Sequence, residues 1–165
     1  MFDLKTAVAE KFGGIDILIN CAGVIFAGDV ETTFPQDYDY LVDLNLRTPF
    51  VLIQFFLEFL RVSQGCVINI SCDKGSRPEA GLIGYCMTKA GLEMMTKSSA
   101  MELAPFGIRV NCVSPSFIDT NMYRFAGLTD PENEALKSRV KNTIPLGRTG
   151  TEIEVAKAVI FLTSE

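Results

Sequence analysis

The stretch IDILINCAG, residues 15–23, decides the fold. Its first six residues form a short apolar run with β-branched side chains, and a turn of small residues ends it. Such a run is typical of a strand that is buried on both faces of a parallel sheet. Residues 66–71 (CVINIS) repeat the signature, and residues 108–113 supply a third strand. The sequence therefore predicts three buried parallel strands.

Helical patterns precede and separate these strands. Leu4, Val8 and Phe12 recur at helical spacing, and Gly13-Gly14 ends that helix. Residues 38–60 carry apolar side chains at the same spacing, which predicts one long helix. Start and stop signals mark the other helix ends: Thr33-x-x-Gln36 with Pro35 before residue 38, Pro105 and Gly107 after residues 84–103, Asp130-Pro131, and Thr151-x-x-Glu154 before a last helix that ends near Thr163.

Strands that alternate with helices predict parallel βαβ units, and therefore an α/β fold with a doubly wound sheet. No repeat or linker divides the chain, so we expect a single domain over residues 1–165. In such a sheet a ligand binds beyond the carboxyl ends of the strands. Small and polar residues gather at all three of these ends, at residues 20–23, 71–72 and 114–116.

Composition excludes several classes of function. The 165 residues are 48% apolar, with a formal net charge of −5 and no lysine- or arginine-rich run that could follow a nucleic-acid backbone. The chain has no histidine and no C-x-x-C pair among its five cysteines, which argues against a zinc site and a histidine-based triad. The apolar stretch at residues 48–60 is short and contains Gln54 and Glu58, so no membrane span is predicted and a reducing, cytoplasmic location is expected.

Tyr85 and Lys89 are the residues that first suggest chemistry. They lie four positions apart at the start of a predicted helix, so both side chains share one helix face. An ammonium near a phenol favours the phenolate, which would lower the tyrosine pKa from its usual value of about 10 and make the phenol a proton donor and acceptor. The same pair occurs by chance in many helices, so its context has to support the assignment.

That context is a series of motifs in a fixed order. Residues 20–23 (NCAG) follow a strand, Asn45 lies in the next helix, Ser71-Cys72 follow the second strand, and residues 85–89 (YCMTK) and 115–120 (PSFIDT) come after them. This series resembles the short-chain dehydrogenase/reductase family over nearly the whole chain. The resemblance implies a Rossmann-like fold and a nicotinamide-dependent oxidoreductase that interconverts a carbonyl and an alcohol.

The resemblance also implies catalytic roles. Tyr85 would pass a proton to or from the substrate oxygen, and Lys89 would lower the pKa of that phenol and bind the nicotinamide ribose. Asn45 would support a proton relay through water. Without the resemblance, Asn45 is equally well explained as a polar residue at a helix kink or on a solvent-facing side.

For the cofactor, NAD or NADP, the resemblance implies contacts on both sides of the cleft. Three residues would border the adenosine-side ribose, and the loop after the third strand would receive the nicotinamide ring. A bare backbone at Gly23 permits close approach, although a plain turn glycine has the same appearance. The cofactor-binding residues implied are Asn20, Ala22, Gly23, Tyr85, Lys89, Pro115, Ser116, Ile118 and Thr120.

Two positions depart from the family pattern. The family's catalytic serine stands thirteen residues before the tyrosine, where this chain has Cys72 and the neighbouring position has Ser71. A thiol is a weaker hydrogen-bond donor than a hydroxyl, so we expect weaker polarisation of the carbonyl unless Ser71 is presented instead. The second departure is Ser116, where the family usually has glycine.

The resemblance further implies that the sequence is one part of the family's domain. We expect about three strands of the sheet to be retained with their flanking helices, without the glycine-rich turn that binds the pyrophosphate or the closing strand. The strand at residues 15–20 would then form an unpaired edge. The substrate, a small-molecule carbonyl or alcohol, would meet the variable stretch 117–148, where Met122, Tyr123 and Phe125 predict an apolar lining.

A second function from another class remains open. The chain could be a non-catalytic module that associates with full-length relatives through residues 38–60 and 84–103, because family members commonly form homo- or hetero-oligomers through these helices. The apolar run at residues 50–57 fits such a face, and it fits an ordinary core helix equally well.

Overall fold

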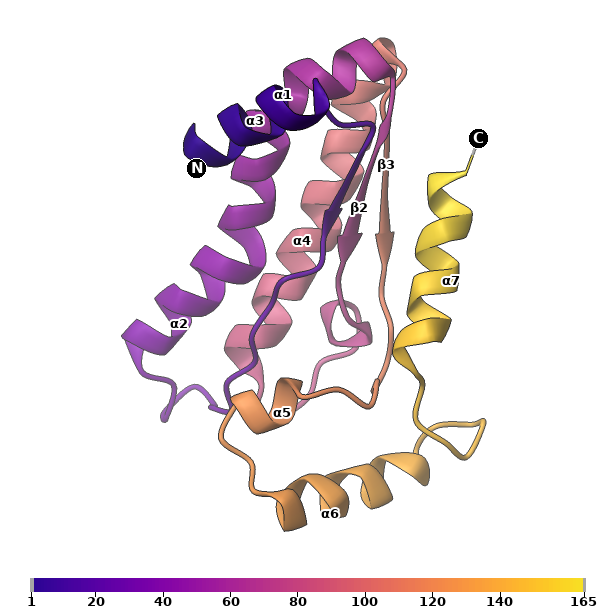
Figure 1. Cartoon of the computed structure of the whole chain (residues 1–165). Helices are drawn as coiled ribbons and strands as arrows, with labels where there is room; N and C mark the ends of the chain where they lie inside the picture. The colour runs from indigo at the N-terminus through magenta and orange to yellow at the C-terminus, as the bar shows by residue number, and fades with distance from the viewer. Residues whose placement is uncertain (1, 165) are drawn as a thin grey trace.

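The computed structural model describes residues 2–164 and has one parallel sheet with helices on both faces (Figure 1). The strands are β1 (Ile17–Asn20), β2 (Cys66–Ile70) and β3 (Arg109–Val113), in the order β1-β2-β3. The predicted strands and their parallel pairing are confirmed. The predicted domain, residues 1–165, begins and ends one residue outside the described part and stays a prediction.

Helices α3 (Thr48–Ser63) and α4 (Ile83–Leu103) cover one face of the sheet, and α7 (Glu152–Thr163) covers the other (Figure 1). This layering is the Rossmann-like, doubly wound arrangement that the sequence predicted. The remaining helical segments are α1 (Phe2–Phe12), α2 (Pro35–Val42), a π-helical turn (Asp43–Arg47), α5 (Met122–Phe125), α6 (Asp130–Lys141) and two 3-10 turns at Asp73–Gly75 and Ala104–Phe106.

The main core lies between the sheet and the helices of one face. Leu60 of α3 and Val67 of β2 have no exposed surface, and Ile53, Phe56 and Val110 pack into the same cluster. Burial of each such side chain stabilises the fold by about 1.5–3 kcal/mol. This core fixes β2 at the centre of the sheet and thereby positions the carboxyl ends of all three strands.

Strand β1 differs from its prediction. It was expected to be buried on both faces, but Ile17 and Ile19 are 44% and 47% exposed. Leu18 packs toward the core on the α3 side, so the two isoleucines point to the opposite face, where α7 contacts β2 and β3. Within residues 2–164 no strand pairs with the outer side of β1. The expected unpaired edge is therefore confirmed.

The start of α2 also differs. The predicted capping box at Thr33 is wrong, because the helix begins at Pro35 with Phe34 as its N-cap residue. The Thr33 hydroxyl instead donates a hydrogen bond to the carbonyl oxygen of Asp29, at 2.6 Å. The Asp29 carboxylate accepts from the backbone of the next residues and folds a tight turn that uses the threonines before the helix starts. The proline in the first helical turn was predicted correctly.

The long helix predicted for residues 38–60 contains a π-helical turn at Asp43–Arg47. Pro49 follows directly and has no backbone N–H to donate to a carbonyl one turn earlier. The backbone N–H of Thr48 bonds to the carbonyl of Asp43, five residues back, so the widened turn accommodates the proline. This extra residue in the turn determines where Asn45 points.

The continuous helix Pro35–Ser63 has 29 residues, longer than the stretch considered from sequence, and is long and apolar enough to cross a membrane by length and composition alone. A buried core helix passes the same test. Ile53, Phe56 and Leu60 of this helix are buried against the sheet, whereas Phe50 and Val62 are exposed.

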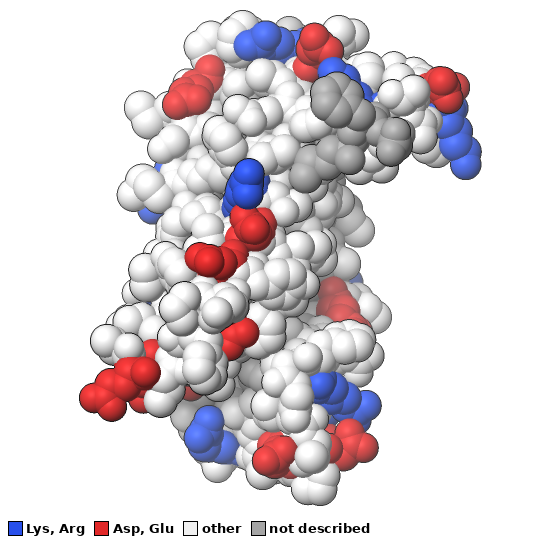
Figure 2. All heavy atoms as spheres, turned by 90° about the vertical axis from the view of Figure 1, so that its left-hand side faces the viewer, with Lys and Arg blue, Asp and Glu red and all other residues white. Residues whose placement is uncertain are grey.

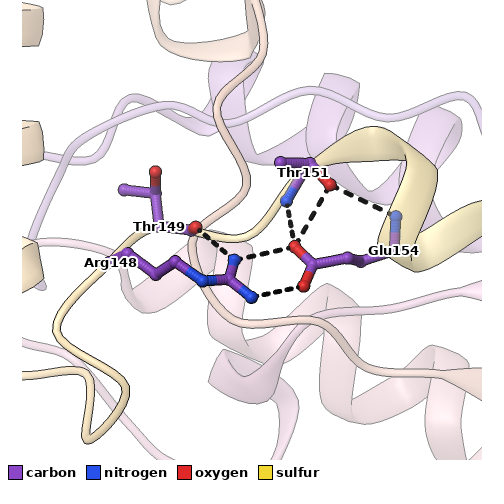
Figure 3. Close-up of polar contacts among 4 residues, drawn as sticks. All are labelled: Arg148, Thr149, Thr151 and Glu154. Atoms are coloured by element: carbon purple, nitrogen blue, oxygen red, sulfur yellow. Dashed lines mark hydrogen bonds and ion pairs between the residues drawn. The ribbon is translucent and has the colours of Figure 1, made fainter.

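The predicted cap of α7 is confirmed. The Thr151 hydroxyl accepts from the Glu154 backbone N–H, and the Glu154 carboxylate accepts from the Thr151 backbone N–H (Figure 3). Arg148 adds two hydrogen bonds to the same carboxylate, at 3.0 and 2.6 Å. These bonds, Arg148 foremost, lower the pKa of Glu154 to about 2. The network fixes the start of α7.

Replacement of Arg148 should change the acid sensitivity of the fold. Because the pKa of Glu154 is lower in the folded chain, its contribution to stability is complete above the ordinary glutamate value and is lost as the pH falls toward 2. We expect urea unfolding of Arg148→Ala to depend less on pH between about 5 and 3 than that of the wild type. The exposed Arg139→Ala variant is the control. An unchanged pH dependence in Arg148→Ala would contradict the assignment.

Candidate active site

A cleft of about 990 Å³ lies beyond the carboxyl ends of the strands. The loops after β1, β2 and β3, the start of α4, and helices α5 and α7 form its walls. Most of the residues predicted for the site line it, namely Ala22, Gly23, Ser71, Cys72, Tyr85, Lys89, Pro115, Ser116, Ile118 and Thr120. Asn20 and Asn45 are not part of the lining; they lie in the interior beside it.

Tyr85 and Lys89 are both almost fully buried and share one side of α4, as the spacing predicted. The Lys89 ammonium lies 5.6 Å from the centre of the Tyr85 ring and donates a hydrogen bond to the Ile70 carbonyl at 2.9 Å. The expected direction of the pKa shift is wrong for this structure: burial raises the pKa of the Tyr85 phenol and lowers that of the Lys89 ammonium. Loss of hydration disfavours the charged form of each group.

Cys72 is the side chain that meets the tyrosine. Its side chain packs against the buried cluster that contains Tyr85. The Ser71 hydroxyl points elsewhere, toward the Lys89 carbonyl at 3.2 Å and the Glu93 carboxylate at 3.3 Å. In this structure Cys72, and not the Ser71 hydroxyl, lies beside the cluster that contains Tyr85, and the catalytic use of either residue stays a prediction.

Asn45 fastens the loop after β1 to the helices. Its side-chain oxygen accepts from the Val24 backbone N–H, and its side-chain nitrogen donates to the Val24 carbonyl, both at 2.9 Å. The same nitrogen lies 3.3 Å from the Thr88 hydroxyl of α4. The residue is only 1% exposed. In this structure the amide is a clamp on the cleft wall, so its predicted part in a water relay stays a prediction.

Gly23 sits where that wall is tightest. A Cβ atom at this position would lie 3.2 Å from the Asn45 side-chain oxygen and 3.5 Å from the Lys89 ammonium. The first distance is shorter than ordinary van der Waals contact. A side chain at this position would therefore crowd Asn45, and the predicted close approach of a cofactor to Gly23 stays a prediction.

Asn20 belongs to a polar ladder under the sheet. Its amide nitrogen donates to the Asn69 side-chain oxygen at 2.8 Å, and Asn69 donates in turn to the Thr96 hydroxyl at 2.9 Å. The ladder joins β1, β2 and α4 in series. Asn20 thus supports the strand ends from below, and its predicted contact with a cofactor stays a prediction.

The loop after β3 forms the opposite wall. Ile118 pairs with Gly150, which holds this loop beside the start of α7. The Thr120 hydroxyl accepts a hydrogen bond from the Met122 backbone N–H at 3.3 Å, at the start of α5. The Ser116 hydroxyl donates to the Asp73 carboxylate at 3.1 Å and so connects this loop to the loop after β2.

An apolar surface faces these polar groups. Met122, Tyr123 and Phe125 line the cleft as predicted, and the Tyr123 ring stacks on Phe117 with ring centres 4.9 Å apart. The sequence did not identify the contribution of α7, which adds Val155, Ala156, Val159 and Ile160, or that of the segment at residues 24–26. The only signal in the sequence was the high apolar content of the last helix, which equally fits a plain core helix.

Comparison with known proteins gives a consistent result. Residues 2–165 match the family model described as enoyl-(acyl carrier protein) reductase. The chain is 37% identical over 159 residues to 3-oxoacyl-[acyl-carrier-protein] reductase FabG from Staphylococcus aureus, and 36% identical over 167 residues to L-fucose dehydrogenase from Bos taurus. These matches cover 96% and 99% of this chain but 62% of each relative, so the chain spans about three fifths of their length.

Two solved structures share the fold. A short-chain dehydrogenase/reductase of unknown function from Caenorhabditis elegans, solved with cofactor, matches with a TM-score of 0.90 at 27% identity, over 98% of this chain and 63% of that protein. A gluconate 5-dehydrogenase from Burkholderia cenocepacia, solved with NADP and tartrate, matches with a TM-score of 0.87 at 27% identity, over 97% of this chain and 62% of that protein.

Removal of the Asn45 side chain should weaken the cleft wall. Asn45→Ala leaves the Val24 backbone groups without their partners, so we expect the free energy of unfolding to fall by about 2–4 kcal/mol. Hydrogen exchange at residues 22–26 should become faster. The exposed Asn142→Ala variant is the control for loss of an amide. Unchanged stability and exchange in Asn45→Ala would show that the clamp does not hold this loop.

Proposed function

We propose that this chain, which belongs to the short-chain dehydrogenase/reductase family, is an oxidoreductase that interconverts a carbonyl and an alcohol with NAD or NADP. The observation that carries the proposal is the meeting of Tyr85, Lys89 and Cys72 in one cleft at the carboxyl ends of the parallel strands. This is the position at which a doubly wound sheet binds its ligand. The relatives are a reductase and two dehydrogenases, and these activities support the proposed oxidation and reduction chemistry.

A nicotinamide cofactor fits the cleft by size and by shape. A volume of about 990 Å³ leaves room for a nicotinamide and its ribose beside a substrate, and Gly23 keeps the wall near Lys89 free of a side chain. By the family resemblance, Gly23, Lys89, Ile118 and Thr120 would hold this half of the cofactor. When bound, NAD(P) supplies or accepts a hydride. The solved relative from Burkholderia cenocepacia contains NADP, and this chain's own choice stays open to test.

Tyr85 would carry the proton in this reaction. The phenol carries its proton near neutral pH, and by the family resemblance it would donate that proton to a substrate carbonyl oxygen during reduction. The Lys89 ammonium lies over the ring and would stabilise the phenolate left behind. Cys72, in contact with the phenol, would lie beside the same substrate oxygen.

The cleft favours a substrate with an apolar portion. The acid/base groups lie at the strand ends, and the rings and methyl groups of Phe117, Tyr123 and Val159 line the same cleft. We therefore propose a small-molecule carbonyl or alcohol whose reacting carbon is next to an apolar group. The relatives include a reductase of acyl groups and a dehydrogenase of a sugar, so the choice between an acyl and a sugar substrate is left to experiment.

A second candidate function, a module that associates with another copy of the family's fold, is favoured by one surface. Met87, Met94 and Met101 recur every seven residues on α4 and are 51%, 61% and 81% exposed. Phe50 of α3 is 46% exposed. On the side where α2 and α3 lie, Figure 2 shows few charged side chains, separated by broad uncharged areas. Exposed apolar surface of this kind is typical of an interface.

The proposed chemistry predicts a specific loss in Tyr85→Phe. Titration of the chain with NADH and NADPH, followed by nicotinamide fluorescence, should give saturable binding that Tyr85→Phe leaves unchanged. Turnover of a carbonyl substrate should fall at least about 100-fold, because the proton donor is removed. Tyr38→Phe, outside the cleft, is the control. Binding with equal turnover in Tyr85→Phe would remove Tyr85 from the mechanism, and a folded chain that binds neither cofactor would overturn the proposal.

The second candidate predicts association through α4. Sedimentation of the chain mixed with a full-length relative should show a mixed oligomer, and Met94→Glu should dissolve it because a charge cannot be buried in an apolar contact. Lys97→Glu, an exposed change on the same helix, tests whether charge alone has this effect. A wild-type chain that stays monomeric when it is mixed with the full-length relative would rule this function out.

A further inference from the structure

We infer that Asp73 is a positioning residue of the cleft, whose carboxylate fixes the Cys72 thiol against Tyr85 and locks the loops after β2 and β3 together. The catalytic consequence rests on the proposed function, whereas the positioning itself does not. Asp73 does not line the cleft, and it was not among the residues predicted from the sequence. Its role is to hold two residues that do.

The two carboxylate oxygens of Asp73 bind residues of two different loops, one after β2 and one after β3. The Cys72 thiol donates to one oxygen at 3.3 Å, and the Ser116 hydroxyl donates to the other at 3.1 Å. The backbone adds a third link, because the Asp73 N–H donates to the Pro115 carbonyl at 3.0 Å. The side chain is 19% exposed, so these contacts are partly shielded from water. One residue thus connects the ends of two neighbouring strands.

The aspartate is itself held in place. It begins the short 3-10 turn Asp73–Gly75, and its carbonyl accepts from the Arg77 backbone N–H at 2.9 Å. The Lys74 ammonium lies 3.7 Å from its carboxylate and bonds more closely to Glu79, at 2.9 Å. The carboxylate therefore keeps its strongest hydrogen bonds for the cleft residues.

These bonds decide what the thiol can do. Cys72 has one thiol proton, which it donates to the Asp73 carboxylate, and the same side chain packs against the cluster that contains Tyr85. The carboxylate therefore sets the orientation of the thiol beside the tyrosine. Without the carboxylate the thiol would lose this partner and the orientation that it fixes.

Asp73 also accounts for both departures from the family pattern. Cys72 stands in place of serine and Ser116 in place of glycine, and both donate to this one carboxylate. A glycine at position 116 has no side chain with which to bond Asp73. The two unusual residues and the aspartate therefore form one unit in this chain.

The charge of Asp73 gives this unit a measurable signature. Burial is the largest cause of the raised pKa of the Cys72 thiol, and the Asp73 carboxylate raises it further. The other titratable groups that interact with the thiol come from the same loop, from α4 and from α5: Lys74, Tyr85, Lys89 and Tyr123. Loss of the aspartate charge should therefore leave a thiol that ionises more readily.

The experiment measures alkylation of Cys72 by iodoacetamide, with peptide mass spectrometry to separate it from the other four cysteines. We expect Asp73→Ala to speed alkylation on the order of tenfold at pH 8, the factor for a one-unit fall in thiol pKa, and to move the midpoint of the pH profile downward. Asp73→Asn keeps an acceptor oxygen without the charge, so it should shift the midpoint with a smaller increase in rate.

Glu79→Gln removes an equal charge from the same loop without touching Cys72 and should leave both readouts unchanged. Equal alkylation rates and midpoints in wild type, Asp73→Asn and Asp73→Ala would overturn the positioning role. The asparagine variant decides the matter if the alanine variant does not fold. Because alkylation needs no turnover, an inactive wild type would count against the proposed function alone.

In an active chain, Asp73→Asn should lower kcat with KM unchanged, and an unchanged kcat would remove the catalytic consequence.

Discussion

The buried hydrogen bonds between Asn45 and Val24 are the interaction on which the cleft depends. A single side-chain amide satisfies both polar groups of one backbone residue, much as a neighbouring strand would, and does so with almost no contact with water. The bonds hold the loop after β1 against the helices, so closely that a side chain at Gly23 would crowd Asn45 and meet Lys89. The amide reaches Val24 from the π-helical turn that accommodates Pro49.

The rest of the site follows from parallel strands that end at one edge of the sheet. Each strand delivers its following loop to the same place, so residues far apart in the sequence become neighbours. The polar ladder from Asn20 through Asn69 to Thr96 fixes those ends relative to α4, which carries the tyrosine and lysine. Asp73 then joins two of the loops directly. The cleft is rigid on its polar side because its supports are hydrogen-bonded rather than merely packed.

Burial gives this site its electrostatic character. Tyr85 and Lys89 lie side by side on α4, and the cost of removing charge from water raises the pKa of the phenol and lowers that of the ammonium. Spacing along a helix predicted that the two side chains would meet, but it contains no information on how much water surrounds them. For the same reason the sequence could not choose between Ser71 and Cys72, which both follow the end of β2. Only the packing of this loop against α4 directs the Ser71 hydroxyl to the Lys89 carbonyl and leaves Cys72 beside the cluster that contains Tyr85.

The sequence by itself determined the three parallel strands, the helices between them, the cap of α7, and the cleft residues carried by ordered motifs, because these depend on local periodicity and on hydrogen bonds within a few residues. Only the tertiary structure decided the exposure of Ile17 and Ile19, the turn around Thr33, the clamp at Asn45 and the role of Asp73. Each of these depends on groups brought together from separate elements, and their distances are fixed only when the sheet and its helices pack.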